Sequence, residues 1–110
     1  MTYIHVELVG RVATVPTSVM VGGRQVTNLR VAIDRPAHAS TAAPHTPLFF
    51  SVCIWHHSPK QHMPTLRKGD LIKVAGRLDT RHSSHTGLTY TQVVTDRFEL
   101  LHSSAHTRAA

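Results

Sequence analysis

The chain has 110 residues, a single cysteine and a strongly basic composition. Lysine and arginine outnumber aspartate and glutamate by 12 to 6, which gives a formal net charge of +6 and a pI of about 10.5 and favours a polyanionic partner. One cysteine excludes an internal disulfide framework and a multi-cysteine metal site. No apolar run approaches the roughly 20 residues of a membrane span, and the N-terminus lacks a signal-peptide pattern, so a single cytoplasmic domain is expected.

The first third of the chain predicts strands separated by a tight turn. Residues 3–15 alternate between apolar and polar side chains, with Gly10 in the middle, where it suits a bend or bulge of a curving sheet. Residues 18–21 and 25–33 are extended segments on either side of Gly22-Gly23. The glycine pair predicts a hairpin turn or a bulge.

The most informative strand is predicted over 48–55. Side chains alternate between the two faces of a strand, so one face here is apolar throughout: Leu48, Phe50, Val52 and Ile54. The opposite face carries Phe49 and Trp55 with small residues between them. Aromatic side chains on the second face of a sheet, in a basic chain, offer flat apolar surfaces to a ligand.

The remaining segments complete an all-β pattern. They are a long loop over 34–46, a short helix within 59–67, a strand over 71–78, a polar hairpin loop over 79–87 and a last strand over 88–101. The pattern gives five long strands with a helix after the third, which is typical of a small closed barrel of the OB type. We expect residues 1–102 to form this domain and residues 103–110 to be a flexible tail.

Several segments resemble bacterial single-stranded DNA-binding proteins, in the same order and at similar spacing. They are Leu8-Val9-Gly10-Arg11, the runs 29–35 and 50–55, Leu66-Arg67-Lys68-Gly69-Asp70, the run 74–78 and the Thr-Gln-Val-Val segment at 91–94. Together they extend over nearly all of residues 3–101. The resemblance implies a five-stranded OB barrel that binds single-stranded DNA without sequence specificity in replication, recombination or repair. It also implies a homo-oligomer, with a tetramer favoured over a dimer.

That function requires aromatic platforms and phosphate-binding cations. Aromatic rings stack on bases, and Arg and Lys release counterions from phosphates. The stacking candidates are Phe49 and Trp55; the phosphate candidates are Arg11, Arg30, Arg35, Lys60, Lys68, Lys73, Arg77 and Arg81. The alternative for Trp55 is the core edge or an oligomer interface, for Phe49 packing against the long loop, and for each cation a solvated surface charge. Tyr90 is interpreted as structural or interfacial.

The chain also departs from the family pattern. Ala37, His38 and Ser83 stand in loops where members often carry an aromatic, and no acidic residue follows Glu99, where the family has an acidic tail. A second reading is therefore a relative of the dimeric, tail-less primosomal protein PriB, acting as an adaptor whose OB surface contacts replication or restart proteins. An RNA-binding protein of cold-shock type fits less well, because its closely spaced aromatic motifs are missing.

Neither a metal site nor a catalytic site is predicted. His56, His57 and His62 cluster after the central strand, but no carboxylate or cysteine completes a set at zinc spacing. Ser51 and Cys53 lack a nucleophile elbow. We therefore expect a binding protein that is not an enzyme and needs no cofactor. Salt dependence separates the two binding functions, because DNA affinity falls steeply with salt.

Overall fold

The computed structural model describes residues 2–34, 46–56 and 65–104. The strands in these residues are β1 (His5–Val12), β2 (Thr17–Val21), β3 (Arg24–Ile33), β4 (Leu48–Trp55), β5 (Leu71–His82), β6 (Thr89–Thr95) and β7 (Phe98–His102). No helix among the described residues is long and apolar enough to cross a membrane.

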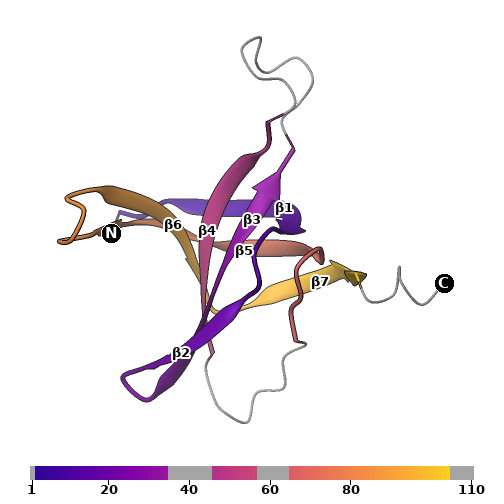
Figure 1. The fold of residues 1–110 in the computed structure, drawn as a ribbon, viewed down its shortest axis with the longest axis horizontal. Helices are drawn as coiled ribbons and strands as arrows, with labels where there is room; N and C mark the ends of the chain where they lie inside the picture. Colours follow the sequence, from indigo (N-terminus) through magenta and orange to yellow (C-terminus); the bar gives the residue numbers. More distant parts are fainter. Residues whose placement is uncertain (1, 35–45, 57–64, 105–110) are drawn as a thin grey trace.

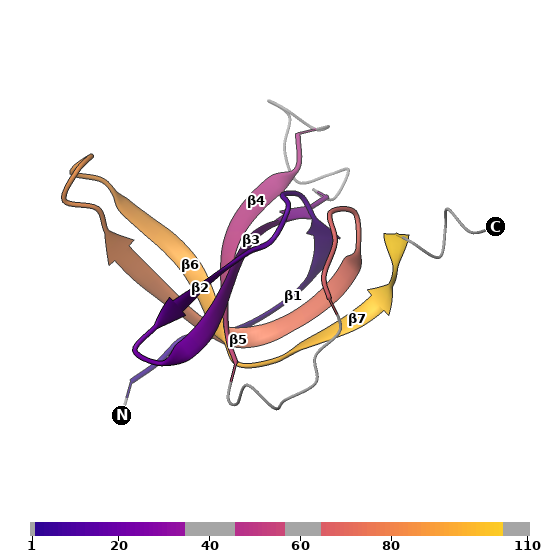
Figure 2. The same cartoon turned by 60° about the horizontal axis from the view of Figure 1, so that its bottom comes forward.

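Five of these strands close into a barrel, which confirms the predicted all-β fold of OB type (Figures 1 and 2). The order is β1-β3-β4-β6-β5, and the pairing of β5 with β1 closes the ring. The β4–β6 pair is parallel, whereas β1 with β3, β3 with β4, β5 with β6 and β1 with β5 are antiparallel. Strand β2 forms a hairpin with β3, and β7 pairs with the start of β5 on the edge opposite β1.

The core lies inside the barrel and uses the predicted apolar face of β4. Val52 and Ile54 are almost fully buried, and Leu48 and Phe50 are half-buried. Val52 and Ile54 belong to one buried cluster with residues from other parts of the chain, which are Val12, Leu29, Val31, Leu66, Ile72, Val74 and Val93. The period-two alternation of β4 therefore separates an inner apolar face from an outer face.

The turn at Gly22-Gly23 is a hairpin turn, which was predicted alongside the alternative of a bulge. Both glycines have positive φ, 56° and 80°, and β2 pairs with β3 directly on either side of them. Positive φ at both central residues is the requirement of the two-residue turn that suits the twist of antiparallel strands. This turn makes β2 and the start of β3 an arm that extends away from the barrel (Figure 1).

Several boundaries differ from the prediction. Strand β1 ends at Val12 and not at residue 15, and larger differences concern β5 and the last strand. The segment 79–82 belongs to β5, where it pairs with β6, so the loop is shorter than the predicted 79–87. The end of β5 and the start of β6 form a second arm, the β5–β6 arm, and both of its faces meet solvent. Polar residues therefore fill it without apolar alternation. The last strand is interrupted at Asp96 and Arg97, where Arg97 N donates to the Thr95 hydroxyl at 3.2 Å. Most of the predicted helix within 59–67 lies outside the described residues, and so do residues 105–110 of the predicted tail.

Gly10 and Gly76 stand where the neighbouring backbone of the barrel leaves no room for a side chain. A Cβ on Gly10 would lie 2.5 Å from the carbonyl oxygen of Ala32, and one on Gly76 would lie 2.3 Å from the carbonyl oxygen of Val94. Strand β1 passes from β5 to β3 just after Gly10, and β5 gains β6 as a neighbour just after Gly76. The absence of a side chain thus permits the close approach that closes the barrel.

Asp70 fastens the end of β7 to the turn before β5. Its carboxylate is 1% exposed and accepts hydrogen bonds from Ser104 N at 2.8 Å, Ser104 Oγ at 2.9 Å and Arg67 N at 2.8 Å. Burial alone would raise the pKa of Asp70, but these hydrogen bonds favour the charged form and hold the pKa below its usual value. We call this arrangement the Asp70 clasp.

Replacing Asp70 with asparagine is expected to lower the free energy of unfolding by about 2 kcal/mol at neutral pH, because charge-assisted hydrogen bonds are lost and an amide donor then faces other donors. A depressed native pKa stabilises the fold above the unfolded aspartate pKa of about 3.9, and this contribution is lost as the pH falls through the native value. The difference between wild type and D70N should therefore shrink in acid. Urea unfolding of both proteins at neutral pH and near pH 3 measures it, and a constant difference would contradict the charged clasp.

Candidate nucleic-acid interface

The outer face of the sheet carries a groove, here called the main groove, with a volume of about 910 Å³. Residues of β2, β3, β4, β5 and β6 line it, including Arg24, Trp55, Arg77 and Arg81. A smaller depression, the side groove, is lined by Arg30, Ser51 and Tyr90, among others. The two share three residues, which are Asn28, Arg81 and Gln92. They therefore form one continuous surface across the outer face.

Trp55 lies at one end of this surface and is held by an arginine. The Arg24 guanidinium lies over the indole, 5.3 Å from the ring centroid. Arg24 Nε donates to the carbonyl oxygen of His56 at 3.3 Å, which orients the guanidinium. A cation over an aromatic face contributes roughly 0.5–1 kcal/mol at an exposed site.

Phe49 repeats this arrangement at the other end of β4. Its ring is 46% exposed, and the Arg30 guanidinium lies 5.2 Å from its centroid. Phe49 and Trp55 are on the same outer face because they are separated by an even number of residues. At a rise of about 3.3 Å per residue, their Cα atoms are roughly 20 Å apart. The face thus presents two aromatic rings, each beside a guanidinium.

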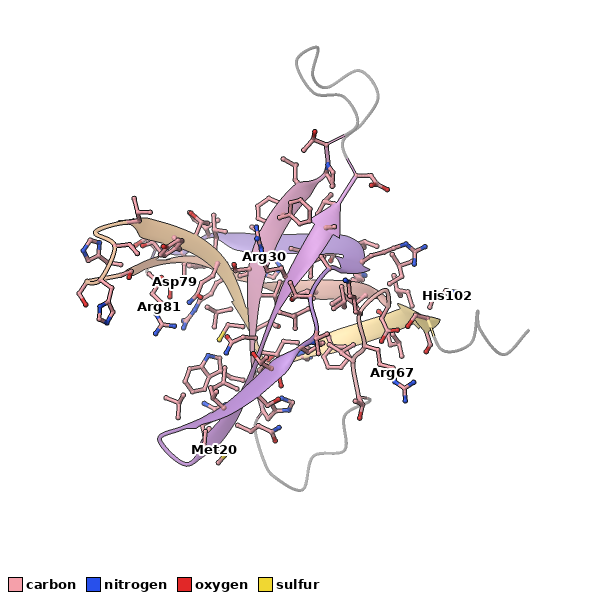
Figure 3. The ribbon with its side chains drawn as sticks, in the orientation of Figure 1. Met20, Arg30, Arg67, Asp79, Arg81 and His102 are labelled. Atoms are coloured by element: carbon pink, nitrogen blue, oxygen red, sulfur yellow. The ribbon has the colours of Figure 1, made fainter. Side chains whose placement is uncertain are left out.

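The structure brings only some of the predicted cations to this surface. Arg30, Arg77 and Arg81 line the grooves, and Figure 3 shows Arg81 on the β5–β6 arm and Arg30 nearer the middle of the molecule. The other described candidates, Arg11, Lys68 and Lys73, line neither groove. Arg35 and Lys60 lie outside the described residues.

Two of the cations away from the grooves have protein partners. Arg11 Nη1 donates to the carbonyl oxygen of Gly69 at 3.2 Å, and Lys73 Nζ lies 3.7 Å from Glu7 Oε1. Both lie at the end of the barrel where β1 pairs with the start of β5. Both side chains thus have contacts within the chain and lie away from the two grooves.

The predicted cations did not include Arg24. Arg24 shares its face with Arg30, and counting back from Arg30 in steps of two along the strand would have found it. Tyr90, interpreted as structural or interfacial, is 47% exposed, pairs across the sheet with Arg81 and lines the side groove. Its hydroxyl is 3.2 Å from that of Thr86.

The histidine and cysteine near Trp55 have structural partners. His56 Nε2 lies 2.8 Å from the Thr27 hydroxyl, which in turn lies 2.9 Å from the Ser18 hydroxyl. Burial raises the pKa of the Cys53 thiol, although a hydrogen bond with Trp55 and the charge of Arg81 act in the opposite direction. Within the described part of the chain, no three His, Cys, Asp or Glu side chains are grouped so as to hold a metal ion. His57 and His62 lie outside it.

Comparison by sequence gives one family and no curated relative. A model of the single-strand binding protein family matches residues 4–101, which is nearly the extent over which the sequence segments showed a resemblance. No curated protein matches the chain significantly.

Comparison by structure gives solved proteins of the same fold. The second single-stranded DNA-binding protein (SSBb) of Mycobacterium smegmatis is 20% identical, with a TM-score of 0.63 over 91% of this chain and 90% of that one. The dimeric N-terminal domain of PriB from Thermoanaerobacter tencongensis is 17% identical, with a TM-score of 0.64 over 89% and 96%. The Plasmodium falciparum SSB in complex with single-stranded DNA is 20% identical, with a TM-score of 0.66 over 92% and 96%.

Proposed function

The chain belongs to the single-strand binding protein family, and we propose that it binds single-stranded DNA along the two joined grooves without requiring a defined sequence. The observation that carries this proposal is that one exposed face holds both aromatic rings and cations, the two kinds of group that such binding needs. Trp55 lines the main groove, and Phe49 lies outside both grooves next to Arg30 of the side groove. Four exposed arginines line the grooves: Arg24, Arg30, Arg77 and Arg81.

The proposed mechanism divides the work between charge and stacking. The arginines neutralise phosphates and release counterions, which attracts any sequence. Bases then stack on Phe49 and Trp55, since every base has a π face. Duplex DNA hides those faces, so the combination selects single strands. In the free protein, Arg24 and Arg30 already lie over the rings, close enough to contact the phosphate next to a stacked base.

The biological setting is a further part of the proposal. We assign the chain to DNA replication, recombination or repair in the cytoplasm, as a homo-oligomeric binding protein and not an enzyme, with residues 1–102 as the binding domain. The family supports this setting. The second candidate is an adaptor like PriB, whose outer face contacts a protein of the replication-restart machinery. The similarity of the fold to a dimeric PriB domain favours keeping it.

Trp55 fluorescence tests the proposal, because Trp55 is the only tryptophan. We expect a mixed-sequence single strand of about 15 nucleotides to quench it, and the duplex of the same sequence to leave it nearly unchanged. Four phosphate contacts give a slope of log affinity against log salt of about −3, so affinity should fall roughly fiftyfold between about 50 and 200 mM salt. Absence of binding in this titration and in a mobility-shift assay would overturn the proposal in favour of the adaptor.

A further inference from the structure

Tyr90 places a third aromatic ring on the outer face of the sheet. The residue belongs to β6, is 47% exposed and lines the side groove. Side chains two residues apart share a face of a strand, and Gln92 on the same face lines both grooves, whereas Val93 on the opposite face is 1% exposed in the core. The ring of Tyr90 therefore faces the groove surface and not the barrel interior.

Two arginines share the side groove with this ring. Arg81 is directly opposite Tyr90 in the antiparallel β5–β6 pair, and the Cβ atoms of such a pair are roughly 4.5–5.5 Å apart. Arg30 of β3 lines the same groove, and Figure 3 shows Arg81 on the β5–β6 arm. Tyr90 thus combines an exposed ring with nearby guanidinium groups, as Phe49 and Trp55 do.

The ring of Tyr90 is oriented by the loop that joins β5 to β6. The Tyr90 hydroxyl lies 3.2 Å from that of Thr86. Thr86 is itself held, because its Oγ1 accepts a hydrogen bond from Leu88 N at 3.3 Å and its backbone N donates to Ser83 Oγ at 3.4 Å. A ring that is already fixed in place loses little conformational freedom when a ligand packs on it, and this favours binding.

A strand that follows the two joined grooves must pass this ring. It leaves the main groove at the three residues that both grooves share and enters the side groove. Tyr90 is the only aromatic residue among those described that line the side groove, because Phe49 lies outside it. We propose that Tyr90 is a stacking platform for a base of the bound strand, with Arg81 placed to contact a neighbouring phosphate. This inference rests on the proposed function and adds a base-binding position to it.

Two substitutions separate the ring of Tyr90 from its hydroxyl. Tyr90→Ala should weaken binding of a mixed-sequence single strand of about 15 nucleotides by at least about fivefold, because a stacking surface is lost. Tyr90→Phe keeps the ring and should bind within about twofold of wild type. Quenching of Trp55 measures both affinities. Wild-type affinity in Y90A, or an equal loss in Y90A and Y90F, would overturn the stacking role.

Leu88→Ala is the matched control, because Leu88 is a large apolar side chain on the same arm, is 57% exposed and lines neither groove. Its affinity for DNA should equal that of wild type. Thermal unfolding and sedimentation of all three variants should also match wild type. A smaller assembly for Y90A would assign the ring to a contact between subunits and overturn its role in stacking.

Photochemical cross-linking locates the base directly. A strand of about 15 nucleotides containing 5-iodouracil is bound to the protein and irradiated, and the protein is then cleaved after lysine and arginine. Residues 82–97 form one peptide, in which Tyr90 is the only Phe, Trp or Tyr, and Phe49 and Trp55 lie on another. We expect a cross-link on residues 82–97 that Y90A abolishes. Cross-links confined to the other peptide would overturn the role of Tyr90, whereas a wild-type protein that binds no single strand would overturn the proposed function.

Discussion

The double variant F49A/W55A is expected to lose affinity for single-stranded DNA by a factor of at least about 30. Stacking contributes roughly 1–3 kcal/mol per base, so two platforms contribute roughly 2–6 kcal/mol, and each 1.4 kcal/mol is a factor of about ten. Both rings lie on the outer face of β4, away from the barrel interior formed by Val52 and Ile54. Their removal should therefore affect binding far more than folding. Fluorescence anisotropy of a labelled oligonucleotide measures the loss, since the variant has no tryptophan.

Tyr3→Ala provides the matched control for loss of an aromatic ring. Tyr3 is 75% exposed, precedes β1 and lines neither groove. Its replacement should leave affinity unchanged. If F49A/W55A kept its thermal stability and bound DNA as wild type does, the two rings would not be the stacking platforms, and the arginines would have to account for the affinity without them.

Gly76→Ala is expected to destabilise the barrel by about 3 kcal/mol or more, because a Cβ at this position meets parts of the chain that cannot rotate away. It would lie 2.3 Å from the carbonyl oxygen of Val94 and 3.0 Å from the Cβ of Thr95. Overpacking typically costs 1–3 kcal/mol and more when the obstacle is backbone. For a domain of this size, the melting temperature should fall by roughly 10 °C or more. Thermal unfolding followed by circular dichroism measures the change.

A substitution at a glycine in open space is the control, because it removes a glycine without creating a steric clash. Gly87 has a φ of 72° and nothing within 4 Å of a built Cβ. Asparagine tolerates such a backbone, so Gly87→Asn should change the melting temperature little. A melting temperature for G76A close to that of wild type would mean that β5 and β6 separate at little cost where their pairing begins.

The parts of the fold that were predictable depend on short-range rules. The apolar face of β4 follows from alternation alone, and two of the residues predicted to form it, Val52 and Ile54, are buried in the core. The Gly22-Gly23 hairpin follows from turn chemistry, since few other residues adopt positive φ at two successive positions. Both rules depend only on residues that are neighbours in the chain, so they can be applied to the sequence alone.

The cations were less predictable, because a groove is assembled from strands that are distant in sequence. Arg77 and Arg24 line the same groove only because β5, β6, β4 and β3 are neighbours in the closed sheet. Lys73 is on the same face of β5, yet it lies beyond the groove next to Glu7, because β7 and not β6 pairs with that part of β5. Charge and alternation indicate which residues face outward, but register decides which of them face the same ligand.

The β1–β5 seam has a consequence for how the chain acquires its structure during synthesis. Strand β1 is the first to leave the ribosome, but its pairing runs from His5 opposite Arg77 to Arg11 opposite Leu71. At roughly 5–20 residues per second, several seconds separate the appearance of these partners. Throughout that interval most of β1 lacks the neighbour that it has in the barrel, because β3 pairs with it only at Arg11 and Val12. The strand made first is thus among the last to be secured, and ring closure must await the second half of the polypeptide.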